Sequence, residues 1–247
     1  FLTALLVGRL SVFVADWAVF LSVVVLFDFL RGFIYALIGR FDLRVYMHYA
    51  IDAERFLCRG EVLPVLLQRM RGSGSWTAFF DRAAVVVHGS HFVFFLLFGM
   101  AVWFLRRADF RQFTRAMMLL LFIGLLGYLT VPTVPPWMAS DIFHLLPPVK
   151  RLAAELYNFA VPTMRSAFDV NPIAAMPSLH AALPALCAFI ALHHFGKRGG
   201  FFIAYATLVF FSIAYLGEHY LVDILAGVVL AALVYVIVYC VPFRLAR

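Results

Sequence analysis

The amino-acid sequence predicts an all-α, polytopic membrane protein. Hydrophobic residues make up 65% of the 247 residues and charged residues only 13%, whereas soluble domains average about 45–50% apolar and about 25% charged residues. The mean hydropathy is +0.97. Apolar runs of about 20 residues, the length that crosses the hydrocarbon core of a bilayer, recur along the chain. Together these observations predict a bundle of transmembrane helices.

Six segments are apolar enough to be predicted as membrane-spanning helices. They lie approximately at residues 10–30, 83–105, 113–132, 177–196, 201–217 and 219–241. Only Gly217-Glu218 separates the last two, so we expect a sharp turn at the membrane surface there. The length of 247 residues fits a single membrane domain. Within it, residues 1–82 would supply an N-terminal helix and an interfacial segment, and residues 83–241 the helical core.

Two connections between these segments are too long to be simple turns. Residues 31–82 are rich in arginine with interspersed large apolar residues, a pattern typical of amphipathic helices in the membrane interface, and Gly72-Ser73-Gly74-Ser75 predicts a flexible break. Residues 133–176 are rich in proline and contain an amphipathic stretch near residues 150–159. We expect this second connection to be an ordered cap that covers or grips a substrate.

The positive charges indicate topology rather than a nucleic-acid partner. The formal net charge is +7, but the basic residues are scattered between apolar runs without forming a basic face. They gather in the short connections at residues 106–115 and 197–198, which by the positive-inside rule face the cytoplasm. The long connections then lie on the other side. We therefore expect an integral protein of the cell (inner) membrane, with a site that faces the non-cytoplasmic side.

Three polar side chains at the edges of apolar runs are the best candidates for chemistry. His180 begins one predicted helix, and His219 and Asp223 lie four residues apart at the start of another, so that they share a helix face. A carboxylate bonded to one imidazole nitrogen leaves the other nitrogen free as a base or nucleophile. Since ionisable residues at bilayer depth are functional by default, we expect catalysis on a phosphate at the membrane surface.

The start of the predicted helix 177–196 is expected to bind that phosphate. Pro177 suits the first position of a helix. The N–H groups of Ser178, Leu179 and His180 would then point out of the helix N-terminus, where unpaired donors and the helix dipole attract anions. Ser178 and Leu179 are therefore predicted to contact the substrate.

These residues resemble the motifs of the type 2 phosphatidic acid phosphatase superfamily. Pro-Ser-x-His is followed by a helix that starts with His-x-x-x-Asp, and Ser212, His219 and Asp223 have the spacing of the third family motif. The resemblance implies that His219 attacks phosphorus to form a phosphohistidine, that Asp223 orients it and that His180 protonates the leaving group. It covers roughly residues 83–240, implies no metal or other cofactor, and adds Ser212 to the predicted substrate-binding residues.

The positions where this sequence departs from the family motifs indicate one branch of the superfamily. The arginine of the third motif is Ile213, the glycine of the second is Leu179, and the first is reduced to Tyr128 and Pro135-Pro136, without its basic residues. With Trp137 after the two prolines, the chain is more similar to the inositol phosphorylceramide synthase branch, which transfers a phospho-alcohol head group between lipids. The implied partners are a membrane lipid substrate and a lipid or polyol acceptor, and Tyr128 is predicted to bind substrate.

Without the family arginines, the phosphate needs another source of positive charge. Developing charge on a transferring phosphoryl group is usually stabilised by cations. Lys150, Arg151 and Arg165 in the proline-rich connection are the predicted sources. Because a phosphodiester carries one negative charge fewer than a dianionic monoester, this reduced set favours a diester substrate.

Three other functions remain open from the sequence. One is a simple phosphatase for a lipid phosphate or a polyprenyl pyrophosphate. Another is a heme or quinone electron-transfer protein with paired helix histidines, such as His88 with His180, and the third is a lipid transporter with a decayed phosphatase site. His88 and His91, at positions i and i+3, could bind a metal, but a structural role is favoured because the sequence shows no matching pair.

Overall fold

The computed structural model describes residues 8–154 and 170–241. The regular secondary structure in this part of the chain is helical, which confirms the predicted fold class. Two isolated β-bridges, Tyr46 with Thr133 and Thr133 with Ala174, join the segment before α3, the start of the cap and the segment before α10. In chain order the helices are α2 (Leu10–Arg40), α3 (His48–Leu57), α4 (Leu63–Arg69), α5 (Ser75–Leu105), α6 (Arg107–Thr130), α7 (Pro136–Asp141), α10 (Leu179–Phe195), the 3₁₀ helix η2 (Gly196–Gly199), α11 (Gly200–Tyr215), α12 (Leu221–Tyr235) and the π-helix η3 (Val236–Cys240).

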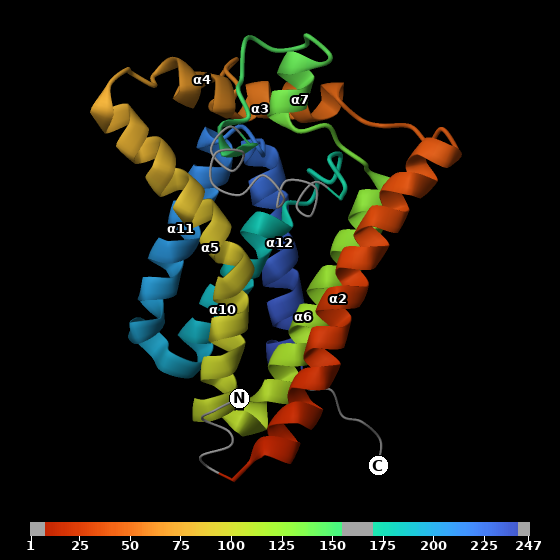
Figure 1. Ribbon diagram of the computed structural model, residues 1–247, viewed down its shortest axis with the longest axis vertical. Helices are drawn as coiled ribbons and strands as arrows, with labels where there is room; N and C mark the ends of the chain where they lie inside the picture. Colours follow the sequence, from red (N-terminus) through yellow and green to blue (C-terminus); the bar gives the residue numbers. More distant parts are fainter. Residues whose placement is uncertain (1–7, 155–169, 242–247) are drawn as a thin grey trace.

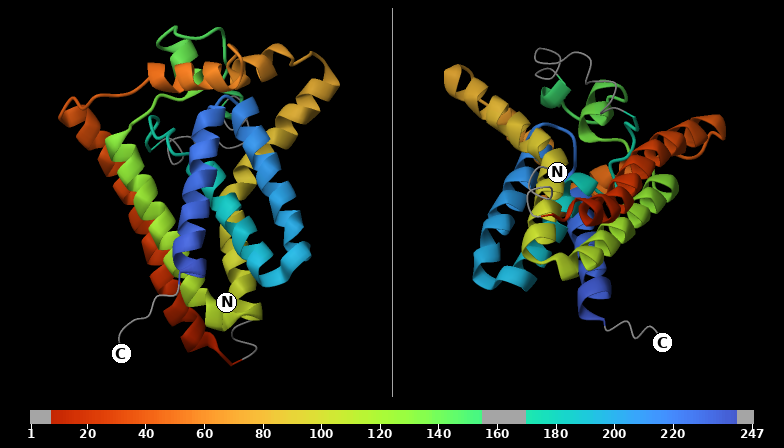
Figure 2. Two further views of the ribbon diagram at one scale, coloured as in Figure 1. Left: turned by 180° about the vertical axis from the view of Figure 1, so that it is seen from behind. Right: turned by 60° about the horizontal axis from the view of Figure 1, so that its bottom comes forward.

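Five helical segments of the described chain are long and apolar enough to cross a membrane. They are α2, α5, α6, Leu179–Tyr215 and Leu221–Cys240. The fourth contains both α10 and α11, which the short η2 joins into a hairpin (Figures 1 and 2). With 17 and 16 residues, each of these helices is shorter than the usual span of about 20 residues. Their two separate crossings, and hence the count of six, stay a prediction.

The first two spanning helices are longer than predicted. Both α2 and α5 have 31 residues and would each measure about 46 Å at about 1.5 Å per residue. This exceeds the hydrocarbon core of about 30 Å, so their polar ends extend into the interface. Of the predicted interfacial segment 31–82, the structure leaves α3 and α4 as separate short helices, and α5 begins directly after the Gly72-Ser73-Gly74 break.

The bundle is arranged around α10. This helix packs against α12, α11, α5 and α6, while α2 lies along α6. The helices α3, α4 and α7 lie over one end of the bundle, and η2 and the junction of α5 with α6 lie at the other end (Figure 1). The long connections and the basic short connections are thus at opposite ends, as the sequence predicts; the side of the membrane that each end faces stays a prediction.

The start of α10 lies against α12 at a very short distance. A Cβ atom at Gly227 of α12 would lie 2.2 Å from the carbonyl oxygen of Ser178, the N-cap residue of α10. No side chain fits into that space. The missing side chain at Gly227 therefore lets the start of α10 lie against the second turn of α12.

We predict that Gly227→Ala destabilises the protein by about 1–3 kcal/mol, the usual cost of overpacking a tight contact. The measurement is the midpoint of thermal unfolding in detergent. Gly39→Ala in α2 is the matched control, because nothing lies within 4 Å of a Cβ atom there and alanine is the better helix former. Equal midpoints for the two variants would contradict the close approach.

Candidate active site

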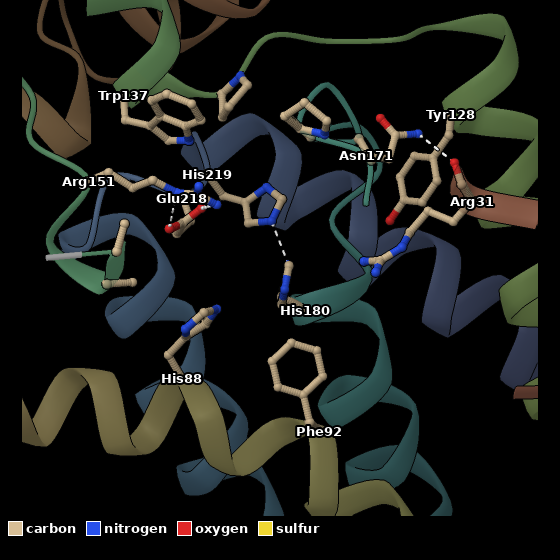
Figure 3. A pocket seen from close by; sticks show the side chains of 16 residues that line it. Arg31, His88, Phe92, Tyr128, Trp137, Arg151, Asn171, His180, Glu218 and His219 are labelled. Carbon is tan, nitrogen blue, oxygen red and sulfur yellow. Dashed lines mark hydrogen bonds and ion pairs between the residues drawn. The ribbon is translucent and has the colours of Figure 1, made fainter. Parts of the chain in front are cut away.

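The structure places the three predicted catalytic residues next to one another, in a series of contacts. His180 lies in the first turn of α10, His219 in the turn between α11 and α12, and Asp223 in the first turn of α12. Nδ1 of His180 is 2.8 Å from Nε2 of His219 (Figure 3). Nδ1 of His219 is in turn 3.5 Å from Oδ2 of Asp223. These distances place both histidines and the carboxylate within reach of one reacting group.

The Asp223 carboxylate faces Nδ1 of His219. Asp223 is fully buried, and its Oδ2 accepts a hydrogen bond of 3.0 Å from the Tyr220 N–H in a capping box at the start of α12. A carboxylate facing Nδ1 favours the tautomer with the proton on that atom. The lone pair of His219 then lies on Nε2, which accepts from the Nδ1–H of His180. Nε2 is therefore the atom of His219 whose lone pair could attack a substrate.

The start of α10 differs from the prediction. The helix begins at Leu179, and Ser178 is its N-cap, so Pro177 precedes the helix instead of opening it. The Ser178 hydroxyl accepts from the Ala181 N–H at 3.3 Å, and the Ser178 N–H donates to the Asp223 backbone carbonyl at 3.1 Å. Leu179 is buried against Gly124 of α6. The predicted substrate contacts of Ser178 and Leu179 therefore gain no support, because their groups hold the helices together.

A cavity of about 90 Å³ lies beside the two histidines. Residues of the cap cover it. They are Pro135 and Trp137 at the start of α7, and Asn171, Pro172, Ala174 and Ala175 from the segment before α10, together with residues 151, 153 and 154. The ionisable and aromatic side chains around it are Arg31, His88, Phe92, Tyr128, Trp137, Arg151, His180, Glu218 and His219 (Figure 3). The prediction that the proline-rich connection covers the site agrees with this placement.

Arg151 lies at the cavity, as predicted for a cation that would contact substrate. Its Nε and Nη2 donate to the two carboxylate oxygens of Glu218 at 2.9 and 3.2 Å, and its guanidinium lies 4.6 Å from the centre of the Trp137 ring. Lys150 is exposed and lines a neighbouring depression instead of the cavity. The third predicted cation, Arg165, lies outside the described residues.

Arg31 of α2 is a cation at the cavity that sequence reasoning missed. It faces the site from the side opposite Arg151 (Figure 3). Its Nη2 donates to Asp28 at 2.8 Å, and its buried Nε has no hydrogen-bond partner among the described residues. The available signal was a charged residue within an almost uninterrupted apolar run, which marks function inside membranes.

Two further predicted contacts differ in their placement. Tyr128 of α6 lines the cavity, where it can reach a substrate. Ser212 does not line it: this buried hydroxyl donates to the Ala84 carbonyl oxygen at 2.6 Å and joins α11 to α5. Its placement supports a structural role and not the predicted substrate contact.

Glu54 of α3 is a second residue that the sequence did not reveal. Its fully buried carboxylate accepts from the N–H groups of Leu221 and Val222, at 3.1 and 3.0 Å, in the first turn of α12. It also accepts from the Leu63 N–H at the start of α4, at 3.1 Å. Burial raises the pKa of Glu54, and these N–H bonds oppose the rise. An interfacial helix thus caps the helix that follows His219.

The cap and α4 also fix the position of the turn before His219. Gly217 has φ +80°, and a Cβ atom there would lie 2.8 Å from the Lys150 carbonyl oxygen. The side-chain amide of Gln68 in α4 donates to the carbonyl oxygens of Lys150 and Tyr215, each at 2.9 Å, and accepts from the Lys150 N–H at 2.8 Å. Gln68 therefore fixes the cap and the His219 turn to each other.

This fold and site define a helical membrane protein with an imidazole pair suited to phosphate chemistry. The family model of the PAP2 superfamily matches residues 76–237, more than half of the chain. The chain therefore belongs to this superfamily, as its motifs predict, and is an integral membrane protein with a phosphatase or phosphotransferase kind of function. Neither a curated protein nor a solved structure matches it.

We predict that Glu54→Ala lowers turnover about 10- to 100-fold, the range expected when a catalytic group is misplaced by about 1 Å. Without the carboxylate, two N–H groups at the start of α12 lose their partner and the His219 turn is no longer fixed. The measurement is kcat, with KM as the comparison, on protein that remains monodisperse. Glu61→Ala, which removes an exposed partner of Arg69, is the control; an equal loss of turnover in both variants would refute the positioning role.

Proposed function

We propose that this protein is a membrane phosphotransferase that moves a phospho-alcohol head group from a phospholipid to a lipid acceptor through a phosphohistidine at His219. The observation that carries the proposal is the line of His180, His219 and Asp223 beside a cavity that the cap covers. In the superfamily motifs that these residues match, the same residue types act as acid, nucleophile and orienting carboxylate.

The first half of the reaction uses both histidines. Binding of the phosphodiester between the rings separates His180 from His219. Nε2 of His219 then forms a bond to phosphorus while the bond from phosphorus to the lipid oxygen breaks. The imidazolium of His180 gives its proton to that oxygen, so that a lipid alcohol leaves and neutral His180 remains. Asp223 stabilises the positive charge that develops on His219.

The second half restores both histidines. The hydroxyl oxygen of the acceptor attacks phosphorus, its proton passes to His180, and the bond between phosphorus and His219 breaks. The products are a new phosphodiester and neutral His219, with His180 again an imidazolium. With water in place of the acceptor alcohol, the same steps release the phospho-alcohol and amount to hydrolysis.

The charge around the cavity favours a phosphodiester over a phosphomonoester. Among the described residues, Arg31 and Arg151 are the arginines that line it, and Glu218 neutralises much of the charge of Arg151. A monoanionic diester matches this modest positive charge better than a dianionic monoester does. The same reasoning supports the inositol phosphorylceramide synthase-like branch, with a phosphoinositol-type head group as the transferred unit.

The proposed site lies at the end of the bundle opposite the basic connections. Together with the positive-inside rule, this arrangement supports our proposal of a site on the non-cytoplasmic side of the cell (inner) membrane. Lipid substrate and lipid acceptor would then both approach from the same leaflet.

The test of the reaction type is incubation of purified protein with a head-group-labelled phospholipid, with and without a lipid alcohol. We expect a labelled new phosphodiester that forms only with the alcohol. Release of water-soluble label alone would make the protein a hydrolase and contradict transfer. Faster release of phosphate from phosphatidate or a polyprenyl pyrophosphate than from any diester would contradict the preference for a diester.

We predict that His219→Ala abolishes turnover and also the covalent label that the protein acquires from a phosphorus-labelled lipid. A label on His219 should be lost in acid and stable in base, as for a phosphorus–nitrogen bond. His193→Ala is the control, because it removes a histidine bonded to Tyr235 near the C-terminal end of α10. Normal lipid movement by His219→Ala in vesicles, without any turnover by the unaltered protein, would identify a transporter instead.

We predict that Arg31→Gln lowers kcat/KM for a phosphodiester by about tenfold or more, since a hydrogen bond to a charged group contributes about 1.5–3 kcal/mol. The control on the same helix is Arg40→Gln, which removes an exposed charge. Initial rates across substrate concentrations provide the measurement. An unchanged kcat/KM in Arg31→Gln would show that Arg31 does not contact the phosphate.

A further inference from the structure

The proposed acid, His180, belongs to a cluster of three imidazoles. His88 and His91 of α5 and His180 of α10 each contribute a ring nitrogen, and these atoms all lie within 4.8 Å of one another. The ring centre of His180 is 5.3 Å from that of His88 and 4.6 Å from that of His91. His88 and His91 are buried. The reaction proposed above uses His180 but gives no role to His88 or His91.

Hydrogen bonds favour a lone pair on Nε2 in two of these rings, where a metal ion could bind it. Nδ1 of His91 contacts the His88 backbone carbonyl, so Nδ1 carries the proton and Nε2 the lone pair. In neutral His180, the proton on Nδ1 faces His219 and the lone pair again lies on Nε2. Histidines that bind metals typically donate their second N–H to a carbonyl or another acceptor in this way.

We propose that His88, His91 and His180 form a binding site for one divalent transition-metal ion such as Zn²⁺, and that an ion bound there inhibits the enzyme. Neutral imidazoles suit zinc, copper and nickel, whereas magnesium and calcium prefer oxygen ligands. Nitrogens at about 2.0–2.1 Å from a tetrahedral zinc ion lie about 3.3 Å apart, so small rotations of these rings would close the site.

The space between the three histidine rings suits a single metal ion and not a larger cofactor such as heme. Three rings with centres this close leave no slot for a flat porphyrin, which argues against heme between His88 and His180. His88 and His180 also line the cavity, so the fourth position of a tetrahedral ion would face the substrate space. A hydroxide or phosphate oxygen in that position would offset part of the positive charge of the ion.

The inhibition, unlike metal binding itself, rests on the proposed function. The acid in that reaction is the imidazolium of His180, with a proton on each ring nitrogen. A metal ion on Nε2 takes the place of one proton, and the remaining N–H of a metal-bound imidazole is a far weaker acid than imidazolium. The ion would also tie the His180 ring to α5, next to His219, and so oppose entry of the phosphate between the two rings.

The binding arm of the test uses Co²⁺, which reports its geometry by visible absorption. The purified protein should bind about one equivalent of Co²⁺ with the intense bands of a four-coordinate site, and added Zn²⁺ should remove them. His91→Phe and His91→Gln each delete one ligand and should lose the bands, whereas the control His193→Phe should keep them. Absence of the bands in the unaltered protein, or their persistence in both His91 variants, would overturn the site.

The activity arm follows lipid turnover as Zn²⁺ is added and then removed with a chelator. We expect turnover to fall at least tenfold at saturating Zn²⁺, to return with the chelator, and to remain near its metal-free level in whichever His91 variant folds. Bound Co²⁺ or Zn²⁺ without loss of turnover, stimulation by the metal, or equal inhibition of the His91 variants would overturn the inhibitory role. If no lipid substrate is turned over, the proposed function fails, while the Co²⁺ bands still decide the metal site.

Discussion

The contact between the starts of α10 and α12 is the constraint on which the site depends. Two helix N-termini, each with a partial positive charge, lie side by side because Gly227 has no side chain and the Ser178 N–H bonds the Asp223 carbonyl. Buried carboxylates of Asp223 and Glu54 offset that charge. The same contact sets His180 2.8 Å from His219, so helix packing and the spacing of the reacting groups are one feature.

The three acidic side chains near this contact each have a partner. Asp223 faces His219, Glu54 binds backbone N–H groups and Glu218 pairs with Arg151. Arg31, with a buried Nε that has no hydrogen-bond partner in the described chain, adds its charge from α2. Since unbalanced charge is costly away from water, this arrangement motivates the proposal of a substrate with a single negative charge. This balance links the departures from the family motifs to the proposed diester chemistry.

The sequence predicted the parts of the site that local chemistry specifies. The short spacing of His219 and Asp223 predicted their proximity, although His219 lies in the turn before α12 and not on the helix face that it was expected to share. Apolar runs of membrane length predicted the fold class. The expectation of a free Ser178 N–H was wrong, because this group bonds the Asp223 carbonyl oxygen. The Ser212 hydroxyl bonds Ala84, so its predicted substrate contact gains no support. The roles of Glu54 and Gln68 could not be predicted, because each side chain bonds backbone groups of residues far away in the sequence. Arg31 carried a signal, but its position facing the cavity depends on how α2 packs along α6.

The sequence by itself determined that this protein is a helical membrane protein of the PAP2 superfamily with a His180, His219 and Asp223 motif, because residue type and short-range spacing fix hydropathy and helix faces. Only the tertiary structure decided which cap residues line the cavity, that Arg31 lies there as well, and that His88 and His91 meet His180. These are contacts between helices. They depend on close packing at positions such as Gly227 and Gly217, where one side chain more would keep the elements apart.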